Sequence, residues 1–314
     1  MKLNKAIETY LASRRSLGIR LVSGGRLLHQ FSREIGDIDL DQIHSQTVAA
    51  FLLGRGQLSA AWTTKFRVLG GLYRFAIARG YVDQSPLPAD TPELPPPLTP
   101  YVYSTAEIQR LLDATKTIRH SAVPNQDETF RTLLLLLYSG GLRVSEALNL
   151  KISDVNLAEK VLTIRDTKFY KTRLIPIGPR MVKELEVHLT TRELLTLPKG
   201  RDSAVFAIRT GEPLRYGQIN EWFQRVRKAA NIGCPAGETR PPRLHDLRHT
   251  AAVHRVIAWY RGGKNVQRLL PHLATYLGHV DIKSTQRYLH MTPELMEEAS
   301  LKFGSYANLG ARHE

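Results

Sequence analysis

The chain has 314 residues, of which 44 are Lys or Arg and 29 are Asp or Glu, so its formal net charge at pH 7 is +15. This length predicts two domains, and the positive excess favours a polyanionic partner, either nucleic acid or an anionic membrane surface. A membrane is the weaker choice, because no apolar run approaches the ~20 residues of a span. The single Cys234 excludes an internal disulfide and fits a reducing cytoplasm.

Residues 1–88 are predicted to form a small helical domain. Its strongest element is a helix over Ser59–Arg79, in which apolar residues recur at steps of three and four and Ser59 can cap the start. Residues 1–90 hold 12 Lys or Arg against 7 Asp or Glu. This balance indicates a DNA-binding domain, and the residues on the helix that we expect to contact DNA are Lys65, Arg67 and Arg74.

A proline-rich segment follows the helical domain. Seven prolines fall between residues 85 and 100, and such a density excludes a helix and predicts a stiff, extended connector. We place the linker at 89–100 and a second domain at 101–314.

The second domain is predicted to be mainly α with a small β-sheet. Ser104 and Glu107 have the spacing of a capping box, and "ETFRTLLLLLYSG" is apolar on all sides, which indicates a buried helix. Two strands are predicted to flank a polar turn at residues 166–170. The helices predicted after them are Pro179–Leu195, Tyr216–Ala230, Asp246–Tyr260, Val266–Leu277, Lys283–Leu289 and a last helix from Thr292.

Cationic and histidine side chains lie beside turns at several places in this domain. In chain order they are Arg143 in "SGGLRVSEAL", Lys168 in "DTKFYKTR", His245 and Arg248 in "RLHDLRHT" and His279 in "YLGHVD", followed by Tyr288. This order and its local surroundings resemble the tyrosine recombinase (phage integrase) family, in particular its Xer-like members. The resemblance covers nearly the whole chain. It implies a helical core-binding domain with a SAM-like fold, a linker and an α+β catalytic domain.

The chemistry of these residue types fits that resemblance. A tyrosine hydroxyl can form a covalent phosphoryl intermediate, and guanidinium groups suit the charge that develops on the non-bridging oxygens. Tyr288 is therefore the candidate nucleophile, and Arg143 and Arg248 are the candidate phosphate clamps. Glu146, three residues after Arg143, is expected to brace it.

Proton transfer has more than one candidate. Lys168 resembles the general acid of the family, and Lys171, three residues later, could compete for that role. His245 is expected to assist proton transfer or to orient the nucleophile, and His279 is expected to hydrogen-bond a non-bridging oxygen. The chemistry needs no cofactor and no metal, because fixed cations supply the positive charge.

The expected partner is double-stranded DNA, with Lys171, Arg173 and Arg243 as further contacts. The resemblance implies that four protomers assemble on two paired sites and exchange DNA strands between them. We expect this to take place in the cytoplasm, in association with the nucleoid. A second recombinase or an accessory DNA-binding protein is a further expected partner. We expect the last helix, which includes Leu295 and Met296, to dock on a neighbouring protomer; the alternative is packing in cis.

Other functions are compatible with parts of this pattern. A type IB topoisomerase-like relaxing enzyme shares the chemistry without paired-site exchange, and a DNA-binding accessory protein would lack an active centre. His245, His249 and His254 suggest a metal-dependent hydrolase, but their spacing is not a strong zinc pattern. Each candidate residue taken alone is more often a surface or core residue, so the recombinase interpretation depends on all of them together.

Overall fold

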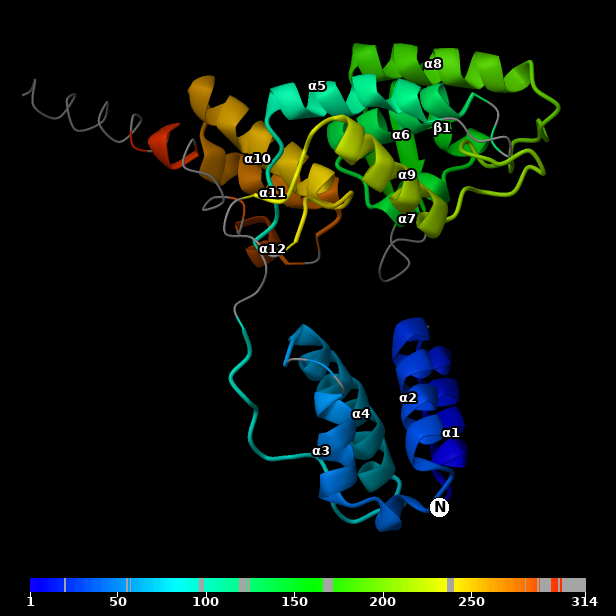
Figure 1. Ribbon diagram of the computed structural model, residues 1–314, viewed down its shortest axis with the longest axis vertical. Coiled ribbons are helices and arrows are strands. Elements are labelled where there is room, and N and C mark those ends of the chain that lie inside the picture. Colours follow the sequence, from blue (N-terminus) through cyan, green and yellow to red (C-terminus); the bar gives the residue numbers. More distant parts are fainter. Residues whose placement is uncertain are drawn as a thin grey trace, which may run out of the picture. The chain divides into compact units, whose positions relative to one another are not determined.

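In a computed structural model, the chain forms two compact units, Met1–Leu98 and Thr99–Glu314 (Figure 1). It describes residues 1–19, 21–54, 56, 58–95, 99–118, 123, 125–165, 172–235, 240–279, 281–286, 288, 295–298 and 300. The boundary between the units falls inside the proline-rich segment, and each unit has its own buried apolar residues.

The first unit is helical. Its elements are α1 (Leu3–Ser16), α2 (Val22–Ile35), the 3₁₀ turn η1 (Leu40–Gln42), α3 (Ser45–Leu53) and α4 (Ala60–Ala78). Helix α4 contacts α1, α2 and α3, and its buried side chains include Trp62, Leu69 and Tyr73. The Oγ of Ser59 accepts a hydrogen bond from the amide of Ala61, so this serine caps α4 as the sequence predicts.

The second unit combines helices with a small antiparallel sheet. The sheet has the order β1 (Val155–Asn156), β2 (Val161–Ile164) and β3 (Arg173–Pro176). In its register Ile164 lies opposite Arg173, so Arg173 begins β3 directly after the connection between the two strands. The helices are α5 (Thr105–Ala114), α6 (Gln126–Ser139), α7 (Val144–Leu148), α8 (Pro179–Glu193), α9 (Tyr216–Ala229), α10 (Asp246–Arg261), α11 (Val266–Leu277) and α12 (Lys283–Gln286), with the 3₁₀ turns η2 (Thr115–Thr117) and η3 (Ile152–Asp154).

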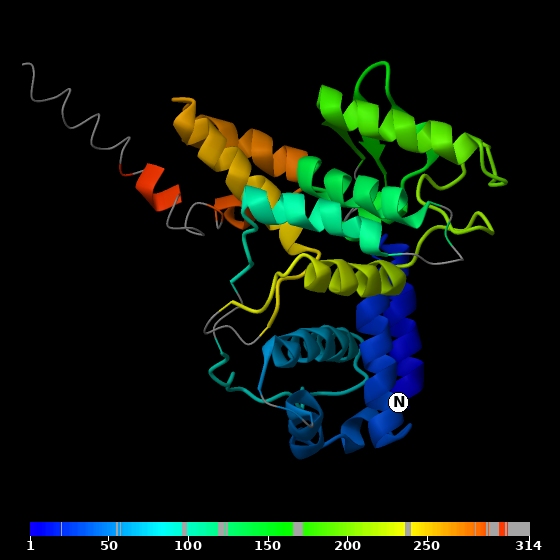
Figure 2. The same cartoon turned by 45° about the horizontal axis from the view of Figure 1, so that its top comes forward.

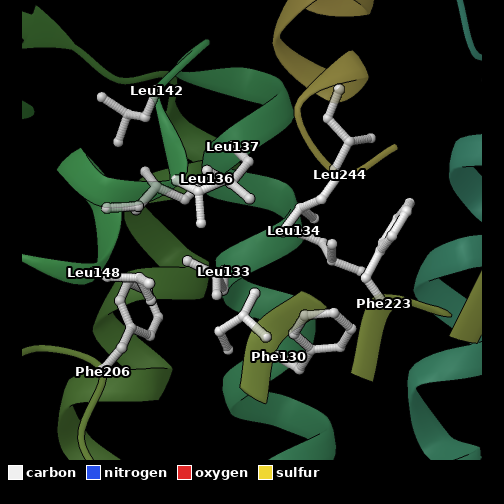
Figure 3. Packing of buried hydrophobic residues seen from close by; sticks show 14 of the residues in the cluster. Phe130, Leu133, Leu134, Leu136, Leu137, Leu142, Leu148, Phe206, Phe223 and Leu244 are labelled. Atoms are coloured by element: carbon white, nitrogen blue, oxygen red, sulfur yellow. The ribbon is translucent and has the colours of Figure 1, made fainter. Parts of the chain in front are cut away.

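Helix α6 supplies much of the core of the second unit. It contacts α5, α7, α8 and α10, and leucines on several sides of the helix are buried, as its apolar sequence predicts. Figure 3 shows Phe130, Leu133 and Leu137 of this helix among side chains from other elements, including Phe206 and Phe223. This core supports both the start of α7 and the start of α10, from which active-site residues project.

Helices α10 and α11 form a second apolar cluster in the same unit. They lie side by side in both views (yellow-orange to orange in Figures 1 and 2). Their buried residues join Tyr288 and Leu295 from the chain that follows them. Tyr288 and Leu295 are therefore attached to the pair through apolar packing.

The fold class predicted from the sequence is confirmed, since the chain is mostly helical with one small antiparallel sheet. Strand β1 is not predicted from the sequence, because its two residues are too few to show an alternating pattern. Within the described part of the chain, no helix is both long and apolar enough to cross a membrane.

Candidate active site

Arg143 and Glu146 are joined at the N-terminus of α7. Glu146 is the third residue of the helix, and its Oε2 accepts a hydrogen bond from the backbone amide of Arg143 at 2.9 Å. Its Oε1 accepts a second bond from Arg143 Nη1 at 2.7 Å. The carboxylate therefore caps the helix and also fixes the side chain of Arg143, which is 31% exposed.

Arg173 holds the same carboxylate from the sheet. Its Nη1 and Nη2 donate to Glu146 Oε1 and Oε2 at 3.0 and 2.7 Å, in the parallel two-bond geometry that suits a guanidinium. Its Nε donates to the carbonyl of Tyr276 at 3.1 Å. The side chain is only 10% exposed, so Arg173 lies inside the site. The sequence predicts instead that this arginine contacts DNA.

Arg248 reaches the same place from α10. It is 3% exposed, and it donates from Nη1 to the carbonyl of Gly141 at 2.6 Å and from Nη2 to that of Leu277 at 2.5 Å. Its Nη1 is 4.0 Å from Glu146 Oε2. Burial, followed by the charge of Arg143, lowers the pKa of Arg248 to about 10, which leaves the guanidinium protonated at neutral pH.

Glu146 is the common anion of these three arginines. Burial alone would raise the pKa of this carboxyl, which is 7% exposed, but the hydrogen bonds from Arg173 and Arg143 lower it to about 2. Three guanidinium groups around one carboxylate leave an excess of positive charge at the site. Such an excess is suited to a phosphate group.

Three histidines adjoin the arginines. His245 immediately precedes α10, and its ring lies 5.1 Å from that of His249, one turn later, measured between centroids. His279 follows α11, and its Nδ1 is 2.7 Å from Thr285 Oγ1. Burial, with further contributions from neighbouring positive charges, lowers the pKa of His245 and takes the pKa of both His249 and His279 to about 4. All three imidazoles are therefore neutral at pH 7 in the protein without DNA.

Tyr288 lies between two of these rings. Its hydroxyl is 3.2 Å from His249 Nδ1, and its ring centroid is 5.9 Å from that of His279 and 5.6 Å from that of His249. The residue is 2% exposed and packs with Val256 and Leu277 in the α10–α11 cluster. The structure thus brings Arg143, Glu146, His245, Arg248, His279 and Tyr288 into one connected set of contacts.

The remaining predicted residues are placed differently. Lys168 and Lys171 lie outside the described residues. Arg243 ion-pairs with the buried Asp246 through two atoms, including Nη2 to Oδ1 at 2.8 Å. Lys65 donates from Nζ to the carbonyl of Phe51 near the end of α3, whereas Arg67 and Arg74 are exposed on α4.

The positions of two residues in the site are not predicted from the sequence. The sequence predicts Arg173 as a DNA contact, and its separation of 27 residues from Glu146 gives no local sign of the pair. The sequence suggests His249 only as a metal ligand, although its spacing of four from His245 places both rings on one face of a helix. Among the described residues, no group of three or more His, Cys, Asp or Glu side chains is arranged to hold a metal ion.

Comparison with known proteins gives consistent matches over most of the chain. Residues 102–294 match the phage integrase family. The integrase/recombinase y4rB of Sinorhizobium fredii is 34% identical, with 94% of this chain and 95% of that protein covered. The tyrosine recombinase XerD of Corynebacterium glutamicum is 30% identical over 94% and 95% of the two chains. A crystal structure of a lambda integrase tetramer bound to a Holliday junction has a similar fold, with a TM-score of 0.63 and 22% identity over 90% and 78% of the chains.

Proposed function

The chain belongs to the phage integrase family of tyrosine recombinases, and from this premise we propose how its second unit cuts and rejoins DNA. As a family member it is a site-specific recombinase, a strand-transferring enzyme that acts on DNA. The roles of the individual residues follow from the chemistry of the step and from the contacts described above.

Tyr288 supplies the nucleophile. Its Oη attacks the scissile phosphorus, forms an ester between the 3′ phosphate and the tyrosine, and displaces the 5′ oxygen of the broken strand. The phenolic proton needs an acceptor, since a free tyrosine has a pKa of ~10. His249 Nδ1 is 3.2 Å from the hydroxyl and His245 lies beside His249, so a neutral imidazole is available at the reacting atom.

Arg143 and Arg248 hold the non-bridging oxygens of the scissile phosphate. Both guanidiniums are already fixed by hydrogen bonds to Glu146 or to backbone carbonyls, so their direction is set before DNA binds. His279 uses Nδ1 for Thr285, and we assign its Nε2 to one of the same oxygens. The proposal is based mainly on the excess of positive charge that the three arginines leave around Glu146.

The leaving 5′ oxygen takes a proton from Lys168 or Lys171. These lysines belong to the connection between β2 and β3, and the second of these strands begins at Arg173 inside the site. The assignment of Lys168 as the first choice rests on its sequence context. Attack of a 5′ hydroxyl from a second strand on the phosphotyrosine then restores a phosphodiester and releases Tyr288.

We further propose that the first unit grips DNA and that four chains assemble on two sites. Arg67 and Arg74 are the exposed cations of α4 that support the first part. The lambda integrase tetramer on a Holliday junction supports the second part by analogy of fold. Action in the cytoplasm on the nucleoid, and the need for a second recombinase or an accessory protein, stay predictions.

The described part of the last segment packs against its own chain. Leu295 is buried in the α10–α11 cluster, and Arg261 Nε donates to Glu298 Oε1 at 2.7 Å. Residues 301–314 lie outside the described part of the chain. Leu295 therefore follows the alternative of packing in cis and does not fit the expected docking of the last helix on a neighbouring protomer. We propose such docking only for residues 301–314, so truncation after residue 300 should leave DNA binding intact and abolish strand exchange.

A nicked suicide substrate tests the nucleophile. The nick lets the short 5′ fragment diffuse away, so a covalent protein–DNA adduct accumulates and can be resolved by denaturing electrophoresis. Tyr288→Phe should form no adduct while keeping its affinity for the duplex, and Tyr216→Phe, at an exposed position on α9, should react like the wild type. An adduct that persists in Tyr288→Phe would contradict the proposal.

A further inference from the structure

The carbonyl groups at the end of α11 each receive a different arginine. Tyr276 accepts from Arg173 Nε at 3.1 Å, Leu277 from Arg248 Nη2 at 2.5 Å, and Gly278 from Arg143 Nη2 at 3.1 Å. The carbonyl end of a helix carries the negative end of its dipole and leaves its last acceptors without partners inside the helix. Three consecutive acceptors therefore fix the spacing of three guanidinium groups.

Two of these arginines are the phosphate clamps, and the third has a different environment. All three nitrogens of the Arg173 guanidinium donate within the protein, to both oxygens of Glu146 and to the Tyr276 carbonyl. Arg143 gives only Nη1 to Glu146 and is three times as exposed. Arg173 is thus directed inward, toward the carboxylate, while Arg143 keeps an open side.

Gly278 makes room for this arrangement. Its backbone has a φ of +68°, which favours glycine, and a Cβ at this position would lie 2.8 Å from Arg173 Nη1 and 3.0 Å from Arg173 Cζ. The guanidinium therefore occupies the space that any other residue would fill. The glycine of the "LGH" sequence is required by both the turn and Arg173.

We propose that Arg173 is a positioning residue, which orients Arg143 and Arg248 for the phosphate through Glu146 and the end of α11 without contacting the DNA itself. The proposal rests on the clamp role of Arg143 and Arg248 given above. Without Arg173, Glu146 loses two of the bonds that fix its plane, and Arg143 then loses its fixed direction. A lysine cannot replace it, because one ammonium group cannot span both carboxylate oxygens and the Tyr276 carbonyl in the planar guanidinium geometry.

The test compares two suicide substrates that differ in one substituent on the scissile phosphorus. The first has an ordinary scissile phosphate, and in the second a methyl group replaces one non-bridging oxygen, so the methylphosphonate is neutral and has less need of a fixed cation. Single-turnover cleavage is measured on both substrates, with the two methylphosphonate diastereomers assayed separately. The readout is the ratio of the phosphate rate to the methylphosphonate rate for each variant.

Arg173→Gln and Arg173→Lys should both cleave the phosphate roughly 10- to 100-fold more slowly, because a small misplacement of the groups that hold a reacting phosphate costs rate on this order. Their ratio should fall in the same direction as that of Arg143→Ala. Arg131→Gln, which removes a salt bridge to Glu184 on α8, is the matched control and should leave both rates unchanged.

The outcomes separate the inference from its premise. If Arg143→Ala leaves the ratio unchanged, the clamp role fails. If Arg143→Ala lowers the ratio but Arg173→Gln slows both substrates equally, Arg173 only stabilises the fold and the inference fails. Wild-type rates for Arg173→Lys would also overturn it, because they would show that a charge alone is sufficient.

Discussion

Replacing Glu146 with glutamine should destabilise the second unit in a way that depends on pH. The carboxylate is buried and accepts hydrogen bonds from Arg143 and Arg173, which hold its pKa at about 2 against an ordinary value of 4.5. A shift of this size corresponds to about 3 kcal/mol, at ~1.4 kcal/mol per pKa unit. The glutamine keeps the shape of the side chain but removes the one negative charge that lies among the three arginines.

The sign of the pH dependence follows from the direction of the shift. The pKa of the folded state lies below that of the unfolded state, so the ionised carboxylate stabilises the protein fully above pH 4.5 and loses this effect as the pH falls toward 2. The difference in unfolding free energy between wild type and Glu146→Gln should therefore be about 3 kcal/mol at pH 7. Linkage reduces it to roughly 1 kcal/mol at pH 3.

Thermal unfolding of the full chain at a series of pH values measures this difference. At pH 7 the melting temperature of the second unit should fall by roughly 6–12 °C, at about 2–4 °C per kcal/mol for a domain of this size. Glu184→Gln is the matched control, because it removes a more exposed carboxylate that pairs with Arg131 and should change stability by ~1 kcal/mol or less. The reasoning is refuted if Glu146→Gln is as stable as the wild type at pH 7.

Three further predictions concern other parts of the second unit. The ring protons of His279 should titrate near pH 4 in an NMR experiment on the DNA-free protein, because burial and the charges of Arg248 and Arg143 lower the pKa of its imidazole. The neutral ring stabilises the fold fully above pH 6.5, the ordinary pKa of a histidine, and this stabilisation is lost as the pH falls to about 4. Gly278→Ala should slow covalent adduct formation and cost about 1–3 kcal/mol in urea unfolding, since it forces a side chain into a left-handed conformation against Arg173. Phe130→Ala should lower the free energy of unfolding by about 3–5 kcal/mol, because the ring is fully buried in the core shown in Figure 3.

Local chemistry explains which elements could be predicted from the sequence. Helix α4 begins after Ser59, and α5 begins after Ser104 with Glu107 completing a capping box, as their sequences indicate. Helix α11 spans Val266–Leu277 as expected, even though it contains a proline. These signals lie within a few residues of the element that they define, so no knowledge of the tertiary structure is needed.

The partners of the site residues could not be predicted in the same way. The brace between Arg143 and Glu146 is a contact across three residues, and the sequence analysis expects it. The pair of Arg173 and Glu146 depends on how β3, which packs against α11, meets the start of α7 in the folded unit, and a buried arginine looks the same in sequence as an exposed one. Lys65 shows the same limit, because its ammonium lies over the Phe51 ring at 4.6 Å and against the end of α3 instead of on an open face.

The nucleophile and the clamp are supported by different kinds of interaction, and this difference has a functional consequence. Arg143 and Arg173 are fixed by charge-assisted hydrogen bonds to Glu146, and all three arginines, Arg248 included, are fixed by the carbonyl end of α11. Their orientation is therefore established when the protein folds and needs no rearrangement as charge develops on a phosphate. Tyr288 is held instead by apolar packing with α10 and α11 and by its contact with His249. Apolar packing has little directional preference compared with hydrogen bonds between charged groups. Because the tyrosine is 2% exposed, we expect its ring to shift within this packing when a phosphate is bound, with His249 Nδ1 still the acceptor of its proton, while the arginines stay in place.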